Sequence, residues 1–295
     1  MRIFVTGANG WIGSASIREL VAGGHDVVGL ARSEEAERTV ADLGATPLRS
    51  DLTDLDGLRA GAADSDGVLH LGYHHDFSQM EEAARIDAAA IETFGDVLAD
   101  GNRFLAIASG TGGLALGRPS TEDDVADPGG HPRIANSHAT LALAERGVKP
   151  LVLRFPPTVH GPGDHGFVAT LVDVARSQGV SAYVGDGQNR WPAVHRLDAA
   201  ALVRRAVENP DAATVLHAVA EEGVATRDIA EAIARQLDLP TVSVEPDRAA
   251  EHFGWLGGFF SWDVPASGAR TQERFGWNPA QATLLEDLDA GHYTG

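Results

Sequence analysis

A glycine-rich segment, Thr6-Gly7-Ala8-Asn9-Gly10-Trp11-Ile12-Gly13, lies where a short apolar run meets the first amphipathic stretch. Gly7 allows a tight turn, Gly10 lets backbone N–H groups approach a pyrophosphate, and Gly13 lets a helix pack closely on a strand. The helix that follows would offer unpaired N–H groups and the positive end of its dipole to phosphates. This spacing between a strand and a helix predicts dinucleotide binding.

The end of the second predicted strand indicates which dinucleotide binds. An acidic side chain there would accept hydrogen bonds from a ribose 2′-hydroxyl, whereas an arginine would pair with a 2′-phosphate. In this chain Arg32 and Ser33 follow the strand, which favours NADP(H). The alternative is that Arg32 is a solvated loop residue and that Glu34 or Glu35 reaches a free ribose.

These residues need a scaffold, and the first half of the chain alternates β-rich runs with helical patterns. Repeated βαβ units of this kind predict an α/β fold of the Rossmann type, a doubly wound parallel sheet with ligands at the carboxyl ends of its strands. We expect a dinucleotide-binding domain from residues 1–165 plus about 190–222. A small, mainly helical substrate lobe is expected from about 166–189 and 223–295. The predicted strands are 2–6, 26–31, 46–49, 67–71, 103–108 and 150–155.

Composition excludes several classes of protein. The 295 residues contain no cysteine, so no disulfide framework, zinc-thiolate site or thiol nucleophile is possible. The formal net charge of −19 argues against nucleic acid and anionic membranes as partners. No apolar run has membrane-spanning length, and the first one directly follows Met1-Arg2, which leaves no room for the parts of a signal peptide. No residue spacing matches a metal-ligand motif. We therefore expect a cytoplasmic protein with a small-molecule substrate and no metal.

Further segments match a known pattern in order along nearly the whole chain. They are Asp51-Leu52-Thr53-Asp54, His70-Leu71-Gly72, Ala108-Ser109-Gly110-Thr111, the run from Leu153 to Gly163, Gly185-Asp186-Gly187, His195-Arg196-Leu197-Asp198 and Phe275-Gly276-Trp277-Asn278-Pro279. Together with the glycine spacing, they resemble the extended and atypical short-chain dehydrogenase/reductases, the NAD-dependent epimerase/dehydratase family. The resemblance implies that Asp51 contacts the adenine amino group and that Leu52 flanks the adenine ring. The residues implied to line the ribose, pyrophosphate and nicotinamide are His70, Leu71, Gly72, Pro156, Thr158 and Val159.

The catalytic centre departs from that family pattern. Its usual members carry a Tyr four residues before a Lys, and the Lys lowers the Tyr pKa so that the phenol can transfer a proton. This chain has one lysine, Lys149, with Glu145 four residues before it, and no Tyr-x-x-x-Lys. If Glu145 matches the acidic residue at the end of the family's helix, the Tyr and Lys positions fall on Ser137 and Leu141.

Other polar residues are candidates to replace the missing pair. The resemblance implies that Ser109 matches the family's catalytic serine, with Thr111 beside it. Tyr73 follows the fourth strand, and His165 lies in a glycine-rich stretch that would cover the nicotinamide; for both, an ordinary loop residue is the alternative. We take Ser109, Thr111, Ser137, Tyr73 and His165 as the candidate catalytic residues.

These features indicate an NADP(H)-dependent oxidoreductase that transfers hydride to the C=N or C=O carbon of a small, apolar substrate. Loss of Tyr and Lys harms ketone reduction more than imine reduction, because an iminium is already protonated. One alternative is a nucleotide-sugar epimerase/dehydratase, which would need the Tyr and cations for a second diphosphate. Another is a non-catalytic NADP(H)-sensing protein.

Two apolar features bear on substrate and assembly. The run from Phe253 to Trp262 would cap a substrate pocket, form a subunit contact or fill ordinary core, and it hints at an apolar, aromatic substrate. The resemblance implies a homodimer through the helices at 80–99 and 134–146, which carry more apolar residues than one core-facing stripe requires. Alanine-rich filler on a monomer surface is the alternative.

Overall fold

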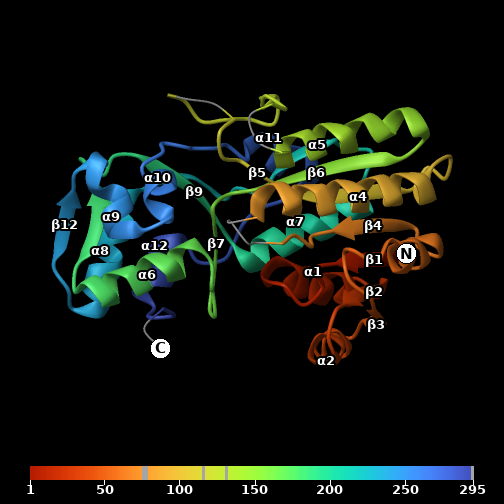
Figure 1. Cartoon of the computed structure of the whole chain (residues 1–295), viewed down its shortest axis with the longest axis horizontal. Helices are drawn as coiled ribbons and strands as arrows, with labels where there is room; N and C mark the ends of the chain where they lie inside the picture. Colours follow the sequence, from red (N-terminus) through yellow and green to blue (C-terminus); the bar gives the residue numbers. More distant parts are fainter. Residues whose placement is uncertain (75–78, 115–116, 130–131, 294–295) are drawn as a thin grey trace.

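The centre of the protein is a parallel sheet of seven strands (Figure 1). The computed structural model describes residues 1–74, 79–114, 117–129 and 132–293. The strand order is β10-β6-β5-β4-β1-β2-β3, which confirms the predicted Rossmann-type α/β fold. The strands are β1 (Arg2–Thr6), β2 (Asp26–Ala31), β3 (Thr46–Arg49), β4 (Gly67–His70), β5 (Phe104–Gly110), β6 (Lys149–Phe155) and β10 (Val215–His217).

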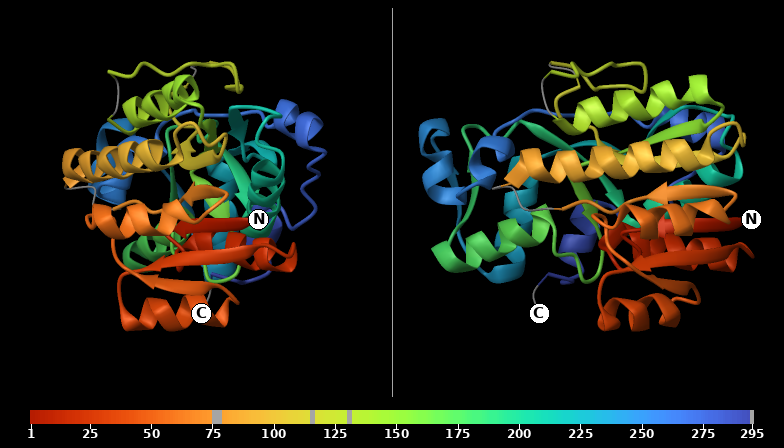
Figure 2. Two further views of the ribbon diagram at one scale, coloured as in Figure 1. Left: turned by 90° about the vertical axis from the view of Figure 1, so that its right-hand side faces the viewer. Right: turned by 45° about the vertical axis from the view of Figure 1, so that its right-hand side comes forward.

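Helices cover both faces of this sheet (Figure 2). One apolar core lies under α1 (Trp11–Ala22), α2 (Glu34–Asp42) and α7 (Arg196–Glu208). The other lies under α3 (Leu55–Ala63), α4 (Met80–Leu98) and α5 (Pro132–Ala142), which the 3₁₀ turn η2 (Leu143–Arg146) continues. Both faces of the sheet are therefore buried from solvent, as is usual for parallel sheets.

The strand order creates a crevice at the carboxyl edge of the sheet. The chain runs from β1 outward to β2 and β3, and it then returns to place β4 on the other side of β1. The register pairs Thr6 with His70, so the loops that follow β1 and β4 emerge side by side. Dinucleotides bind at such a reversal of strand order.

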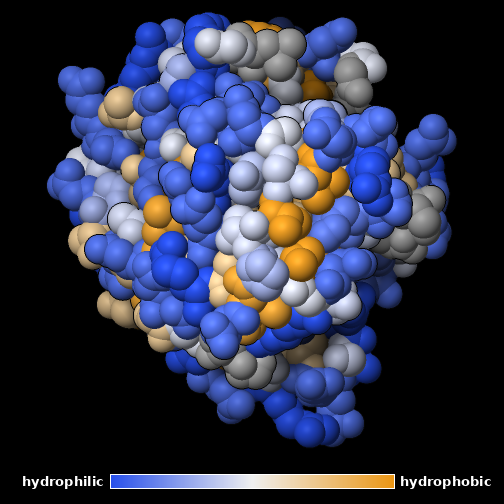
Figure 3. All heavy atoms as spheres, turned by 90° about the vertical axis from the view of Figure 1, so that its left-hand side faces the viewer, coloured by the Kyte–Doolittle hydropathy of each residue, from blue (hydrophilic) through white to orange (hydrophobic). Residues whose placement is uncertain are grey.

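A second lobe lies beyond this edge, at the left of Figure 1. Its core, separate from the two sheet cores, is built around the parallel strands β8 (Ser181–Val184) and β12 (Thr241–Val244). Its helices are α6 (Phe167–Gln178), α8 (Thr226–Leu237), η3 (Pro246–Arg248), α9 (Ala249–Phe253), α10 (Leu256–Phe260) and α12 (Leu284–Asp289). A stripe of hydrophobic residues crosses the otherwise mostly hydrophilic end of the lobe (Figure 3).

A small sheet of three strands connects the lobe with the large sheet. Its strands are β7 (Thr158–His160), β9 (Arg190–His195) and β11 (Glu221–Ala225), in the order β11-β9-β7. The short helix α11 (Ala269–Phe275) packs against α7. Within the described ranges, no helix combines the length and apolar character needed to cross a bilayer. Those ranges also contain no cluster of three or more His, Asp or Glu side chains suited to a metal ion.

Candidate functional site

The glycine turn after β1 is shaped so that only small residues fit. Gly7 has a φ of +64°, and a Cβ there would lie 2.7 Å from the backbone nitrogen of Gly72. A Cβ on Gly13 would collide with the carbonyl oxygen of Gly7. The N-cap of α1 is Gly10, which provides no side-chain cap, and the first turn carries no acidic residue. The Gly10 N–H donates to the Gly7 carbonyl, so the N–H groups left for an anion such as a pyrophosphate are those in the first turn of α1.

A buried series of hydrogen-bonded polar side chains stabilises this turn. The N–H of Gly72 donates to Thr6 Oγ1 at 3.1 Å, and Thr6 Oγ1 lies 2.6 Å from His70 Nδ1. His70 Nε2 is 3.0 Å from Asp87 Oδ1, and Asn136 Nδ2 donates to Asp87 Oδ2 at 2.7 Å. The consistent assignment has the Thr6 hydroxyl donating to Nδ1 and Nε2–H donating to Asp87. The series connects the glycine turn through α4 to α5.

Asp87 and Asn136 did not emerge from the sequence as candidates. Burial raises the pKa of Asp87, but the hydrogen bonds from His70 and from the Asn136 amide lower it further, and the net pKa lies below the ordinary value. The carboxylate is therefore ionised near neutral pH. A sequence signal did exist, because Asp87 interrupts the buried apolar face of the helix between Ala84 and Ala90.

Two hydroxyl groups meet where β5 ends against α5. Ser137 Oγ donates to Ser109 Oγ at 3.0 Å, so the structure brings these two candidates together. The Thr111 hydroxyl is buried with no hydrogen-bond partner among the described residues, while its backbone N–H donates to the carbonyl of Phe155. Leu141, one turn further along α5, brings no charge. The pair can orient a heteroatom of a ligand but has no adjacent lysine to lower a hydroxyl pKa.

An arginine that the sequence analysis did not select lies beside this pair. Arg133 is one helical turn before Ser137, and its Nη2 donates to the Ala108 carbonyl at 3.2 Å. Its guanidinium stacks 4.1 Å from the centre of the Tyr73 ring. Burial raises the pKa of the Tyr73 phenol, and the Arg133 charge partly opposes that rise. Tyr73 is thus a neutral phenol near neutral pH, close to a cation.

A cavity of about 80 Å³ lies next to the hydroxyl pair. Arg154 is buried in its wall, where Nη1 donates to the carbonyl of Asp124 at 3.0 Å and to His217 Nε2 at 3.3 Å. Burial lowers the pKa of His217 to about 4, so the ring is neutral. Glu122 Oε2, also at this cavity, is buried without a hydrogen-bond partner among the described residues. The volume is that of a few water molecules, too small for a whole organic substrate.

The residues predicted to bind the adenosine end of the cofactor differ in whether they already have an ion-pair or hydrogen-bond partner. Arg32 is exposed and makes no ion pair with any described residue, whereas Glu34 is already bound to Arg38 at 2.7 Å. The Ser33 hydroxyl caps α2 by accepting from the Ala36 N–H at 3.2 Å. Arg32 is therefore the group available for a 2′-phosphate.

Asp51 and Leu52 lie in the loop between β3 and α3. Asp51 Oδ1 accepts from the N–H and the hydroxyl of Thr53, at 2.7 and 2.6 Å, and these bonds hold the pKa of Asp51 below its usual value. Leu52 is partly buried and lies against Gly72. Leu52 therefore lies beside the residue that packs against the glycine turn.

Trp11 connects that turn with the loop beyond β6. Its Nε1–H donates to the Val159 carbonyl at 2.7 Å, and its ring lies 5.5 Å from the His165 ring and 4.1 Å from the Arg196 guanidinium. Thr158 directs its hydroxyl to the Pro192 carbonyl, so its side chain holds β7 to β9. Arg196 is a cation beside the glycine turn that the sequence analysis did not select. Of the remaining predicted cofactor residues, Asn9 is exposed, Pro156 is buried, and Ile12 and Leu71 are partly buried against the core.

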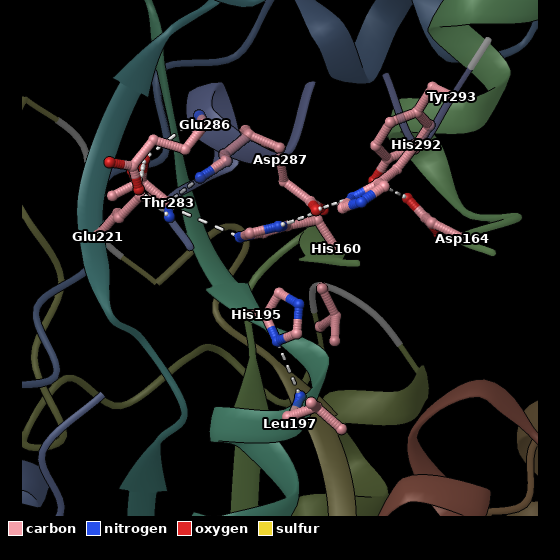
Figure 4. Close-up of polar contacts among 12 residues, drawn as sticks. His160, Asp164, His195, Leu197, Glu221, Thr283, Glu286, Asp287, His292 and Tyr293 are labelled. Atoms are coloured by element: carbon pink, nitrogen blue, oxygen red, sulfur yellow. Dashed lines mark hydrogen bonds and ion pairs between the residues drawn. The ribbon is translucent and has the colours of Figure 1, made fainter. Parts of the chain in front are cut away.

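The chain around residue 293 fixes the loop that carries His165 (Figure 4). His160 Nδ1 and His292 Nδ1 lie 3.0 and 2.5 Å from the two oxygens of Asp287. The Tyr293 hydroxyl donates to Asp164 Oδ2 at 2.9 Å. Burial raises the pKa of Asp164. The loop between β7 and α6 is therefore held by contacts with α12 and the residues after it.

Comparison with known proteins decides the family. The sequence model of the NAD dependent epimerase/dehydratase family matches residues 3–219. The chain belongs to this family. The resemblance predicted from the motifs is thereby confirmed.

Members and neighbours differ in how much they share with the chain. The uncharacterized protein C2A9.02 of Schizosaccharomyces pombe is 48% identical over 294 residues, 99% of this chain and 100% of that protein. A 4-hydroxy-2-methyl-3-oxo-4-farnesyl-3,4-dihydroquinoline-1-oxide ketoreductase of Stigmatella aurantiaca is 31% identical over 188 residues, 60% of this chain and 56% of the relative. The crystal structure of DesIV, a dTDP-glucose 4,6-dehydratase from Streptomyces venezuelae with NAD and TYD bound, superposes with a TM-score of 0.78. It is 17% identical and covers 99% of this chain and 96% of its own, which shows a shared fold.

This chain has the glycine motif of the epimerase/dehydratase family but lacks a Tyr-x-x-x-Lys motif. The glycine turn and the serine at the end of β5 are present, and the turn leaves room for the cofactor's phosphates. Arg133, one turn before Ser137 on α5, is the Asp, Glu, Lys or Arg that lies nearest to Ser137 in the sequence. At the two positions that the resemblance assigns to Tyr and Lys, the chain has Ser137 and Leu141, which carry no charge.

Proposed function

We propose that this protein is an NADP(H)-dependent oxidoreductase that transfers hydride to a C=N or C=O carbon of a small, apolar substrate. The observation that carries the proposal is the Ser109–Ser137 hydroxyl pair, 3.0 Å apart at the carboxyl edge of the sheet. The resemblance to the family implies that reacting groups lie here, and no lysine accompanies the pair. Imines are the preferred substrates in this proposal.

The residues present fit a nicotinamide dinucleotide. Gly7 and Gly13 leave a cradle that a Cβ would fill, and the uncapped start of α1 provides N–H donors for the pyrophosphate. Arg32 is free to pair with a 2′-phosphate, which supports NADP(H) over NAD(H). When bound, the reduced cofactor supplies a hydride.

The hydroxyl pair explains the preference for imines. Ser109 and Ser137 can donate or accept a hydrogen bond at the substrate's heteroatom and so orient the C=N or C=O bond. A ketone also requires a proton as its oxygen becomes an alkoxide, and a serine hydroxyl without a lysine to lower its pKa is a poor acid. An iminium nitrogen already carries its proton. The reductase names of two distant relatives, a ketoreductase and a 2-alkyl-3-oxoalkanoate reductase, support the reductase class.

Two alternative functions have specific support. Solved structures with the same fold are described as a dTDP-glucose dehydratase and a UDP-glucose epimerase, which favours a nucleotide-sugar substrate. Against it, the lobe's Arg190, Arg227 and Arg248 are each bound to a carboxylate, leaving these cations unavailable to a second diphosphate. Loss of the Tyr and Lys favours an NADP(H)-binding protein without catalytic activity.

The test is a spectrophotometric assay of NADPH oxidation with a panel of cyclic imines and activated ketones. We expect turnover of imines to exceed that of ketones, and Ser137→Ala to reduce kcat for imines by about tenfold, the loss of one orienting hydrogen bond. Ser177→Ala, which removes a hydroxyl bonded only within α6, is the matched control. Tight NADPH binding without turnover of any compound would favour the sensor, and calorimetric binding of UDP-glucose would favour the nucleotide-sugar enzyme.

A further inference from the structure

Among the described residues, seven Trp and Phe rings of the substrate lobe form a continuous series of contacts. Three of them, Trp191, Phe253 and Phe260, are buried. The other four form what we name the aromatic wall: Phe167, Trp255, Phe259 and Trp262. Within it, Phe167 lies 5.7 Å from Trp255 and 5.4 Å from Phe259, and Phe259 lies 5.3 Å from Trp262, all between ring centres.

The wall is exposed on its outer side and rigid on its inner side. Trp255 and Trp262 are 54% and 53% exposed, whereas the ring of Trp191 behind them is fully buried and lies 5.1 Å from Phe259. Large exposed rings that pack on buried aromatic rings are typical of a surface that binds a ligand or another protein. The packing fixes the rings, so little entropy is lost when a ligand contacts them.

Two independent contacts place the wall at the proposed reaction site. A Cβ on Gly112, three residues after Ser109, would lie 3.6 Å from the Phe259 ring, so that ring covers the segment that follows the hydroxyl pair. Phe167 begins α6 two residues after His165, and the His165 ring contacts Trp11 on the glycine turn. The wall therefore lies between the two ends of the cleft.

The ring faces of the wall and the net charge of the chain, rather than the neighbouring ion pair, favour a cation over an anion. Arg190, which precedes Trp191, makes two hydrogen bonds with the carboxylate of Asp263, at 3.1 and 3.0 Å, and is neutralised. The whole chain has a net charge of −19, which attracts cations to its surface. The faces of indole and phenyl rings attract a delocalised cation directly.

We infer that the aromatic wall binds a planar, positively charged ring system and thereby selects cyclic iminium ions as substrates of the proposed reductase. This inference rests on the proposed function and names its substrate class. Stacking against Phe167 and Phe259 would bring one edge of the ring toward the hydroxyl pair, and Trp255 and Trp262 would cover its outer face.

The experiment separates binding from turnover by using probes that NADP⁺ cannot reduce. Calorimetry in the presence of NADP⁺ compares 1-methylquinolinium, which is planar and cationic, with planar but neutral 1-methyl-2-quinolone and with non-planar but cationic 1,1-dimethylpiperidinium. We expect 1-methylquinolinium to bind at least about tenfold more tightly than either of the others. Equal affinities, or no binding of 1-methylquinolinium, would overturn the inference.

Variants of the wall locate the binding. Trp255→Leu and Phe259→Leu should each weaken 1-methylquinolinium binding about fivefold, and NADP⁺ affinity should not change. Tyr183→Leu removes a ring of the same lobe outside the wall and should have no effect. An equal loss in the Tyr183 variant would contradict the assignment. Planar-cation binding without imine reduction would end the proposed function alone, whereas imine reduction without a planar-cation preference would end this inference alone.

Discussion

Single residues of this site fall into those that a pattern in the chain can suggest and those that only packing reveals. Ser109 and Ser137 were candidates because each follows a recognisable motif position, and the structure brings them to 3.0 Å. Arg133 lies in no such motif, and Arg196 lies in one but was given no role, because both act through aromatic rings that are far away in the sequence. The periodicity of a sequence does not predict which distant segments come into contact.

The choice of cofactor depends on Arg32. Arg32→Ala should weaken NADPH binding by about 1.5 to 3 kcal/mol, the size of a hydrogen bond to a charged group, and leave NADH affinity almost unchanged. Arg38→Ala, which removes an exposed arginine already bound to Glu34, is the matched control and should change neither affinity. Equilibrium titration by calorimetry measures both cofactors. Equal losses for NADPH and NADH would reject the assignment.

Asp87 should matter for stability because it is buried and bonded on both oxygens. Asp87→Ala leaves His70 and Asn136 without their partner, and we expect the free energy of unfolding to fall by about 2 to 5 kcal/mol. The exposed carboxylate of Asp96, paired with Arg146, is the control: its alanine variant should lose less than about 1 kcal/mol. Denaturant unfolding measures both, and similar losses would contradict the role given to Asp87.

The same residue predicts a dependence on pH. The folded pKa of Asp87 is lowered, so its stabilisation is fully present above the unfolded pKa of about 4 and is lost as the pH falls through the lower folded value. The stability difference between the wild type and Asp87→Ala should therefore be constant above about pH 5 and shrink below pH 4. A difference that grows on acidification would have the wrong sign.

At the scale of elements, strands were easier to predict than the ends of helices or the minor sheets. The six predicted strands appear because each is a β-branched or apolar run bounded by turn residues, and both faces of the sheet are covered. The helix predicted from residue 134 begins at Pro132, since proline suits the first turn of a helix, and it passes into 3₁₀ geometry after Ala142. The strands of the lobe, such as β8 and β12, were not predicted, because two short strands give too little periodicity to read.

The loop between β7 and α6 should be the element most sensitive to residues near the end of the chain. Tyr293→Phe removes the hydroxyl that donates to Asp164, and we expect the unfolding free energy to fall by about 1 kcal/mol and amide exchange in the 161–166 loop to accelerate. Tyr183→Phe removes a phenol in the same lobe that is not bonded to this loop, and it is the control. Unchanged exchange in the Tyr293 variant would show that the loop is held by other contacts.

At the scale of the whole molecule, the homodimer stays a prediction, but one of its arguments changes. Ile91, Phe94 and Leu98 of α4 are buried in the protomer's own core, so they are not spare surface. The outward residues of α5 that remain apolar are small, among them Ala135 and Ala139. An interface there would be a close contact of alanine faces flanked by the ion pairs of Arg146 with Glu92 and Asp96.

Light scattering at micromolar concentration tests the assembly. We expect a mass near twice 30.9 kDa. Ala139→Glu, which places a charge in the middle of the proposed contact, should return the mass to that of one chain, whereas Ala41→Glu, at an exposed position of α2 outside both helices, should not. A single-chain mass for the wild type that is unchanged on concentration would reject the dimer.

The contacts that fix the His165 loop also impose an order on biosynthesis. His160 and Asp287 are 127 residues apart, and Asp164 and Tyr293 are 129 apart. A ribosome makes the nucleotide-binding half of the sheet first, and that half can begin to fold before α12 has left the exit tunnel. The loop between β7 and α6 is therefore fixed last. Pulse proteolysis of stalled nascent chains would show it, because the loop should stay cleavable until residues 287–293 have emerged and become protected once they have.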